Sequence, residues 1–137
     1  MPTDTSSIQE ALRNFYARQA HLIDAGHHED WADTFMPDGE FHSPTYGSAA
    51  IGRASLMGIS KRYQEGAQKA GEQQRHLVQD LWIEQADIHS ARARAYLMIT
   101  AARSTEPGVR ILRLVSIVDQ LLNQDGVWRV ARREVLY

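Results

Sequence analysis

The hydrophobic pattern of this chain changes once, near Gln73, and that change constrains the fold more than any other feature. Before Gln73, apolar residues recur at the spacing of three and four residues that is typical of helices. After it, they alternate or run on continuously, as they do in β-strands. The sequence therefore predicts helices followed by a sheet. Its 137 residues are expected to form one domain, 1–137, with a core and room for one pocket.

Three helices are expected before the change. The first ends at Gly26, a residue type that commonly terminates helices. The second has acidic residues in its first turn and buries Trp31 and Phe35. The third begins at Arg53 and ends by Gly71.

Four long strand segments follow, covering roughly 75–84, 91–103, 109–122 and 127–135. A simple turn between the last two would place Asp119 opposite Val130, with Arg132 or Arg133 near enough for a structural ion pair. Several of these strands are apolar on both faces, and helices can cover only one face. A second copy of the chain is therefore expected on the outer face of the sheet, giving a homodimer.

Charge and composition exclude several classes of function. A net charge of −2 and a pI near 6.3 give no broad positive field, so nucleic acid is not expected as a partner. Without cysteine, the chain has no disulfide and no thiolate nucleophile. No signal-peptide pattern and no membrane-spanning apolar run is present, so we expect a cytoplasmic protein with no membrane partner.

Asp24 is the first candidate for chemistry. It lies at the C-terminal end of the first helix, where the helix dipole disfavours a negative charge, so local stability does not explain it. Such a carboxylate suits a general base or a group that orients an imidazole. An exposed aspartate in a helix-to-helix turn is the alternative interpretation. His21, Asp24 and His28 have the spacing of metal ligands, but Gly26 is expected to break their helix, so no metal site is predicted.

His76 is the second candidate. It is expected on a strand face shared with Asp80 and Trp82, a mixed polar and aromatic row that is typical of a strand lining a cavity. A histidine in that position can transfer protons near neutral pH. The alternative is a surface histidine or a hydrogen-bonded core histidine.

Aromatic and acidic side chains could complete a small-molecule pocket. Each of the aromatic residues could equally be part of the core. The candidates for substrate binding are Tyr16, Trp31, Tyr46, Tyr63, Asp80 and Tyr96.

Four segments carry a resemblance to a known family: LIDAGHHEDWADTFMPDGEF, GRASL, RHLVQDLWIE and DGVWRVARREV. Together they resemble the nuclear-transport-factor-2-like superfamily and, within it, the SnoaL-like polyketide cyclases and dehydratases. The resemblance implies a cone-shaped α+β fold (cystatin-like α+β barrel), in which a curved antiparallel sheet encloses three N-terminal helices and a deep apolar pocket. It also implies a dimer.

The same resemblance implies a site. Related scytalone and bile-acid dehydratases use an aspartate from the end of the first helix with a histidine from the strand after the third helix, and those positions match Asp24 and His76. A tyrosine common in the family is replaced here by Gln19. A proton donor or aromatic residue common in a later strand is replaced by Ile117.

These observations lead to one main hypothesis. The chain is expected to be a cyclase, dehydratase or isomerase that uses acid–base chemistry and no cofactor on a small, aromatic polyketide-type molecule. One alternative is a non-catalytic ligand-binding protein or an accessory subunit of the same fold. Another is an epoxide hydrolase, which would need an Asp–Arg–Asp set around a water molecule.

Overall fold

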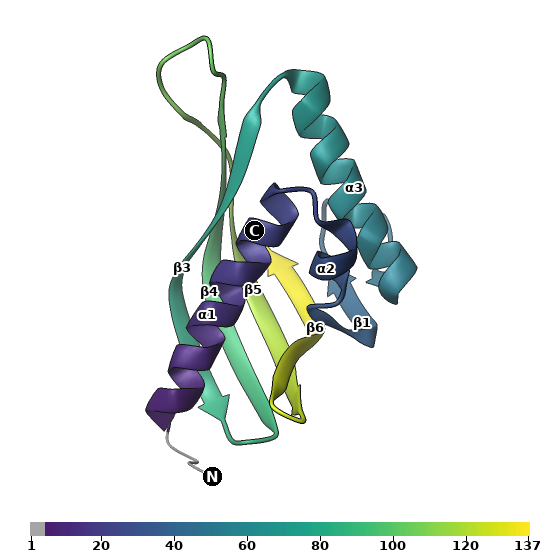
Figure 1. Cartoon of the computed structure of the whole chain (residues 1–137), viewed down its shortest axis with the longest axis vertical. Coiled ribbons are helices and arrows are strands. Elements are labelled where there is room, and N and C mark those ends of the chain that lie inside the picture. Colours follow the sequence, from purple (N-terminus) through teal and green to yellow (C-terminus); the bar gives the residue numbers. More distant parts are fainter. Residues whose placement is uncertain (1–4) are drawn as a thin grey trace.

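The computed structural model describes residues 5–137 and shows three helices and six strands within them (Figure 1). In chain order the elements are α1 (Thr5–Asp24), α2 (His28–Ala32), β1 (Phe35–His42), β2 (Ala50–Ile51), α3 (Arg53–Ala70), β3 (Gln73–Ala86), β4 (Ser90–Ala102), β5 (Arg110–Gln124) and β6 (Val127–Leu136). The predicted change from helices to long strands at Gln73 is confirmed.

The strands form one open, curved sheet in the order β2-β1-β6-β5-β4-β3. The pairs from β3 to β6 are antiparallel, as expected. β1 lies between β2, with which it pairs antiparallel, and β6, with which it pairs parallel. The predicted α+β fold is therefore confirmed, with one parallel pair inside the sheet.

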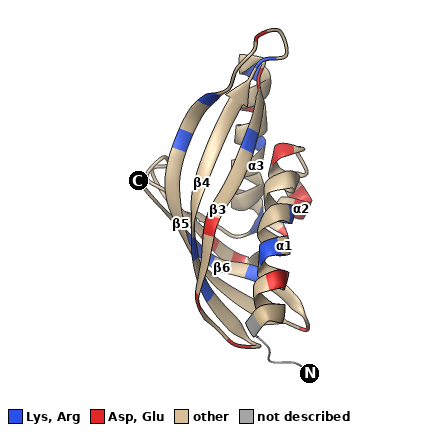
Figure 2. Ribbon diagram, turned by 90° about the vertical axis from the view of Figure 1, so that its left-hand side faces the viewer, with Lys and Arg blue, Asp and Glu red and all other residues tan. Residues whose placement is uncertain are grey.

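All three helices lie on one side of the sheet, and no helix within residues 5–137 covers the opposite face of β3, β4 and β5 (Figure 2). The core fills the space between the helices and the inner face. Its fully buried apolar side chains include Leu12 of α1, Leu56 of α3, Ile117 and Leu121 of β5, and Val130 of β6. None of the helices in the described part of the chain has the length and hydrophobicity needed to cross a membrane.

Helix α1 ends where the sequence predicts. Gly26 has a φ of +77°, a left-handed conformation that glycine adopts without strain. Helix α2 is shorter than expected, because the Thr34 hydroxyl donates a hydrogen bond to the Trp31 carbonyl and the helix closes there. Trp31 is buried as predicted, but Phe35 is buried as the first residue of β1 instead of lying on the helix.

A bulge in β3 changes which side chains face the helices. Asp80 has a φ of +53°, and the pairing with β4 shifts between Gln79 and Trp82. The inward–outward alternation is reset at this point, because a bulge adds one residue to its strand. The expectation that Asp80 and Trp82 share the face of His76 is therefore wrong: Asp80 is exposed and Trp82 is 61% exposed.

The hairpin of β5 and β6 also differs from the predicted register. Its loop is the two-residue turn Asp125–Gly126, with φ values of +54° and +84°, as in the tight turns that suit twisted hairpins. A second bulge shifts the pairing at 120–121, so that Asp119 lies opposite Arg133. The predicted pairing of Asp119 with Val130 is wrong, because the turn is shorter than the simple loop assumed.

Candidate functional site

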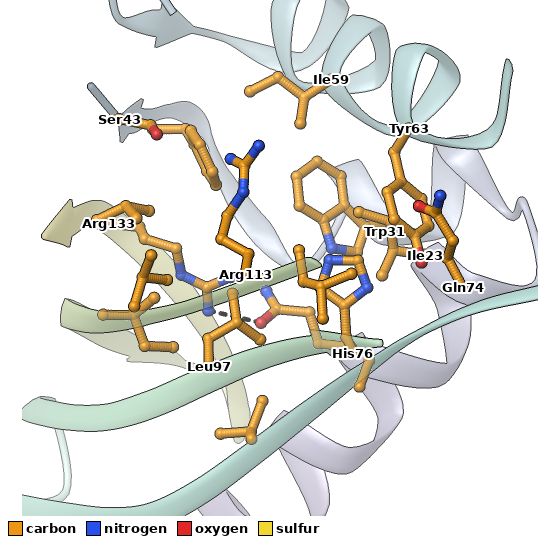
Figure 3. A pocket seen from close by; sticks show the side chains of 18 of the residues that line it. Ile23, Trp31, Ser43, Ile59, Tyr63, Gln74, His76, Leu97, Arg113 and Arg133 are labelled. Carbon is orange, nitrogen blue, oxygen red and sulfur yellow. Dashed lines mark hydrogen bonds between the residues drawn. The ribbon is translucent and has the colours of Figure 1, made fainter. Parts of the chain in front are cut away.

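A cavity of about 350 Å³ lies between the helices and the inner face of the sheet (Figure 3). Its walls are mostly apolar, which is typical of small-molecule sites. The apolar side chains come from α1, α2, α3 and five strands: Ala20, Ile23, Trp31, Phe41, Ile59, Val78, Leu97, Ile99, Leu112, Val115, Ile117 and Val135. Polar groups enter it from His76, Gln74, Ser43 and three arginines.

Asp24 and His76 meet at one wall of this cavity. The Nδ1 atom of His76 lies 2.7 Å from Oδ1 of Asp24, and the backbone N–H of His76 donates to Oδ2 at 2.9 Å. The two side chains are only 12% and 16% exposed, His76 first. Helix α1 delivers the carboxylate from its C-terminal residue, and β3 delivers the imidazole from its first half.

The contact fixes the tautomer of the imidazole. A carboxylate only accepts hydrogen bonds, so the Nδ1 atom of His76 carries the shared proton. When the ring is neutral, Nε2 then keeps its lone pair and can accept a proton. His76 lines the cavity, whereas Asp24 lies behind it and does not.

Tyr63 of α3 completes this group. Its hydroxyl donates to Oδ1 of Asp24 at 3.1 Å, and its ring packs edge-on against the imidazole of His76 with 4.6 Å between the ring centres. Burial, reinforced by the Asp24 carboxylate, raises the pKa of Tyr63 well above its ordinary value. Tyr63 is therefore held as a neutral phenol whose proton points at Asp24.

A second polar group lies at another wall and links α1 to β5 and β6. The Asp119 carboxylate accepts two hydrogen bonds from Arg133, at 2.9 and 2.8 Å, and one from the Tyr16 hydroxyl at 2.6 Å. Arg133 also donates to Oε1 of Gln19 at 2.6 Å, and Gln19 donates to Thr34 at 2.8 Å. All five side chains are buried, and each is satisfied by another member of the group.

The charges of this group balance one another. Burial alone would lower the pKa of Arg133, but the Asp119 carboxylate raises it, so the guanidinium stays charged. Burial and the adjacent carboxylate both raise the pKa of Tyr16. Arg133 lines the cavity, so the guanidinium that reaches the cavity wall there is one whose positive charge is compensated by the Asp119 carboxylate.

The mouth of the cavity carries two further arginines, Arg62 from α3 and Arg113 from β5. The Arg62 guanidinium lies over the Tyr46 ring, 5.3 Å from its centre. Arg113 donates to the hydroxyl of Thr45 at 2.6 Å. Both side chains therefore end at the loop between β1 and β2, of which Ser43 and Tyr46 also line the cavity.

The structure brings together some of the residues selected from sequence and separates others. Trp31, Tyr46, Tyr63 and His76 line the cavity, and Asp24 supports His76. Tyr16 does not line it, because its hydroxyl is bound to Asp119.

Two more of the predicted substrate-binding residues, Asp80 and Tyr96, also lie away from the cavity. Asp80 is exposed because of the bulge in β3. Tyr96 is 53% exposed on the outer face of β4, because it alternates with the buried residues Ala95 and Ala93. Neither residue lines the cavity.

Sequence reasoning missed the arginines of the cavity. Arg133 and Val135 are two residues apart and both lie on the inner face of β6. Strand periodicity would therefore have placed Arg133 inward if the hairpin register had been known. Arg113 lies two residues before Val115 on the inner face of β5, but this segment is apolar on both faces, so alternation alone does not show which face is inward. Arg62 lies one residue before Tyr63 on α3, on the side of the helix that the tyrosine already marked as a pocket wall.

No metal centre is formed by the residues considered from their spacing. His28 contacts Ser60 through Nδ1 at 2.7 Å and Gln64 through Nε2 at 2.9 Å, which ties α2 to α3. His21 is exposed on α1, and Asp24 is bound to His76. Over residues 5–137 there is no cluster of three or more His, Cys, Asp or Glu side chains arranged to hold a metal ion.

Comparison with known proteins places this site in context. A family model described as a SnoaL-like domain matches residues 4–134. The structure is similar to that of Aln2 from a Streptomyces species, with a TM-score of 0.84, 23% identity, and coverage of 98% of this chain and 94% of Aln2. No curated protein sequence matches the chain significantly.

Two further solved structures are similar to it. A protein from Catenulispora acidiphila, in complex with S-DNPA, has a TM-score of 0.79 and 28% identity, covering 96% of this chain and 93% of its own. An NTF2-like protein with a cystatin-like fold from Novosphingobium aromaticivorans has a TM-score of 0.77 and 20% identity, covering 96% of this chain and 88% of its own.

Proposed function

Because this chain belongs to the SnoaL-like domain family, we propose that it is an acid–base enzyme of small-molecule metabolism, acting as a cyclase, dehydratase or isomerase without a cofactor. The observation that carries the proposal is the pair of Asp24 and His76, with the imidazole at the cavity wall and the carboxylate behind it. A histidine that is held by a carboxylate at the wall of an apolar cavity is a typical arrangement of a proton-transfer site.

The proposed roles follow from the geometry. His76 is the catalytic acid and base, since it alone of the pair faces the cavity. Asp24 orients the ring and stabilises the imidazolium that forms when Nε2 takes a proton. Tyr63 is a positioning residue, because its hydroxyl donates its hydrogen bond to Asp24 and only its ring remains to contact a substrate.

The proposed step is a proton transfer next to a carbonyl. Nε2 of His76 removes a proton from the carbon beside a ketone, and the electron pair moves to form an enolate. For a dehydration, the enolate collapses and expels a β-hydroxyl, which receives the proton from His76 and leaves as water. For an isomerisation, the same proton returns to a different carbon. Arg133 directs Nε and Nη2 at Asp119 and Gln19, so its Nη1 group is the donor left to face a substrate oxygen on the opposite wall.

The apolar walls support an aromatic or polycyclic substrate. Trp31 and Phe41 provide flat surfaces on one side, and Leu97 and Ile99 line the cavity from β4. The similar protein from C. acidiphila is in complex with S-DNPA, which supports a ligand-binding role for this chain too.

The buried pair of Asp119 and Arg133 gives no support to an epoxide hydrolase. Such an enzyme needs a carboxylate that activates a water molecule. Both oxygens of Asp119 are instead occupied by Arg133 and Tyr16, and its side chain is fully buried away from the cavity.

The test is turnover of a β-hydroxy ketone, with 3-hydroxy-1-tetralone as a probe that loses water to give 1-naphthol. His76→Ala and Asp24→Asn should each lower the enzyme-dependent rate by about 10²–10⁴-fold, the usual contribution of a general acid–base group. His89→Ala and Asp30→Asn, which change exposed residues of the same types, should leave the rate unchanged. Probe binding without any turnover, unaltered in all four variants, would contradict catalysis and indicate a ligand-binding protein.

We also propose that the chain forms a homodimer through the outer face of the sheet. Trp82, Tyr96 and Leu114 are between 53% and 61% exposed on β3, β4 and β5, the strands whose outer face no helix covers. Exposed apolar residues gathered on one sheet face are typical of a protein–protein interface.

A further inference from the structure

We propose that the substrate carries a carboxylate and that Arg62 and Arg113 bind it at the mouth of the cavity. This inference rests on the proposed function, because it describes how the substrate of the same site is held. It adds a specificity-determining pair of residues and a chemical class of substrate that the acid–base pair alone does not define.

The charge of the cavity wall is the first support. Three arginines and one histidine contribute to the lining, and no aspartate or glutamate among the described residues does so. A cavity with cationic walls and low-dielectric surroundings favours an anionic occupant, because the field is concentrated where water is excluded.

Only two of these arginines have a positive charge that no carboxylate compensates. The charge of Arg133 is compensated by Asp119, which accepts two hydrogen bonds from it. Arg62 and Arg113 form no ion pair with a carboxylate anywhere in residues 5–137; their contacts are the Tyr46 ring and the Thr45 hydroxyl. Both positive charges are therefore left uncompensated.

The two guanidinium groups contact adjacent residues of one loop. They come from α3 and β5, yet they end at the consecutive residues Thr45 and Tyr46. Figure 3 shows the side chain of Arg113 extending from the sheet toward Ser43 and Ile59, away from His76 and Arg133. A carboxylate held there would leave the rest of the molecule to reach inward toward His76.

Guanidinium groups suit this task. Each presents planar, paired N–H donors that match the two oxygens of a carboxylate, and such charge-assisted bonds are stronger than neutral ones. The competing explanation is that the two arginines serve only to hold the loop over the cavity. In that case their removal would weaken charged and neutral ligands equally.

A matched pair of probes separates the two explanations. Calorimetric titrations would compare 2-naphthoate with 2-naphthamide, which has nearly the same shape and no charge. We expect the wild-type protein to bind naphthoate about tenfold more tightly than naphthamide, because hydrogen bonds to a charged acceptor are stronger than those to a neutral one. In Arg62→Gln/Arg113→Gln the preference should fall below about threefold with naphthamide affinity nearly unchanged, and in Arg18→Gln, an exposed control on α1, it should persist.

Several results would overturn the proposal. Equal binding of the two probes by the wild-type protein, binding of neither, or a preference that survives in the double variant would each do so. Tighter binding of 2-naphthyl phosphate than of naphthoate would overturn the assignment of a carboxylate. These titrations need no turnover, so a protein that prefers naphthoate but fails the dehydration test would retain the anion site and lose only the proposed catalytic function.

Discussion

Asp24 and His76 lie 52 residues apart in the sequence, and the two oxygens of the Asp24 carboxylate contact the backbone and the ring of His76. The backbone N–H can only donate, so it requires an oxygen at Oδ2. The second oxygen is therefore the atom that faces Nδ1 and sets the tautomer of the imidazole.

Asp24→Asn should reverse this tautomer. The amide oxygen is expected to stay opposite the backbone N–H of His76, so the amide NH₂ will face Nδ1 and donate to it, leaving the proton on Nε2, and the Tyr63 hydroxyl will turn from donor to acceptor. Nitrogen chemical shifts of the His76 ring, measured by NMR, report which nitrogen is protonated. Tyr63→Phe is the control, because it removes a neighbour of Asp24 without changing the acceptor at Nδ1; a Nδ1–H tautomer in both variants would refute the proposed role of Asp24.

Arg133→Met should destabilise the protein strongly, because it leaves the fully buried Asp119 carboxylate without its counter-ion. A loss of about 3–5 kcal/mol in the free energy of unfolding is expected, the usual cost of breaking a buried pair on one side. Arg132→Met is a matched neighbour: Arg132 pairs with Glu40 and Glu134 at half-exposed positions, so about 0–1 kcal/mol is expected.

The double variant Asp119→Leu/Arg133→Met sharpens this prediction. Removing both charges relieves the unpaired carboxylate, so the double variant should be more stable than Arg133→Met alone. Urea unfolding of the double variant and the two single variants would give the comparison. A double variant that loses the sum of the two single effects would show that the pair is held by something other than its own charges.

Glu72 should make stability depend on pH in the acidic range. The ion pair with Arg110, at 2.7 Å, lowers the pKa of Glu72 from its ordinary value of 4.5. A carboxyl whose folded pKa is lowered stabilises the protein above its unfolded value and loses that contribution as pH falls through the folded value. The stability difference between wild type and Arg110→Gln should therefore be largest near neutral pH and should shrink as the pH falls below the ordinary pKa of a glutamate. Thermal unfolding at a series of pH values measures this difference. A difference that does not change with pH would contradict the prediction.

Leu114→Arg should convert the proposed homodimer into monomers. It places a charge in the middle of the uncovered sheet face, where it would be desolvated by a partner without an opposite charge. Ile51→Arg, on the exposed edge strand β2, introduces the same charge outside that face and should leave the dimer intact. Sedimentation analysis distinguishes the two, and a wild-type protein that sediments as a monomer would rule the interface out.

The order of elements could be predicted because it depends on local pattern. The stop at Gly26, the helix from Arg53 and the change to strands at Gln73 each follow from residues near one another in the chain. Side-chain placement along the strands depends instead on register. Bulges at Asp80 and at 120–121 reset that register, and they follow from packing across strands rather than from the residues themselves.

The candidate site shows the same division. Asp24 and His76 could be selected because the helix dipole made the aspartate unexpected and the family resemblance supplied its partner. Their meeting at 2.7 Å, and the position of Asp24 behind the imidazole, required coordinates. Arg113 was not predicted, because β5 is apolar on both faces and alternation alone does not show which face is inward.

The parallel pairing of β1 with β6 has a consequence for synthesis on the ribosome. β1 is made early, but one of its two neighbours in the sheet is the last strand of the fold, and the other, β2, is only two residues long. Long-range pairing of this kind is slow, because the chain loses the entropy of closing a large loop before stabilising contacts form. The nascent chain therefore carries Trp31, Phe35 and Phe41 without their final cover until β6 emerges, and that interval is when it most needs protection from aggregation.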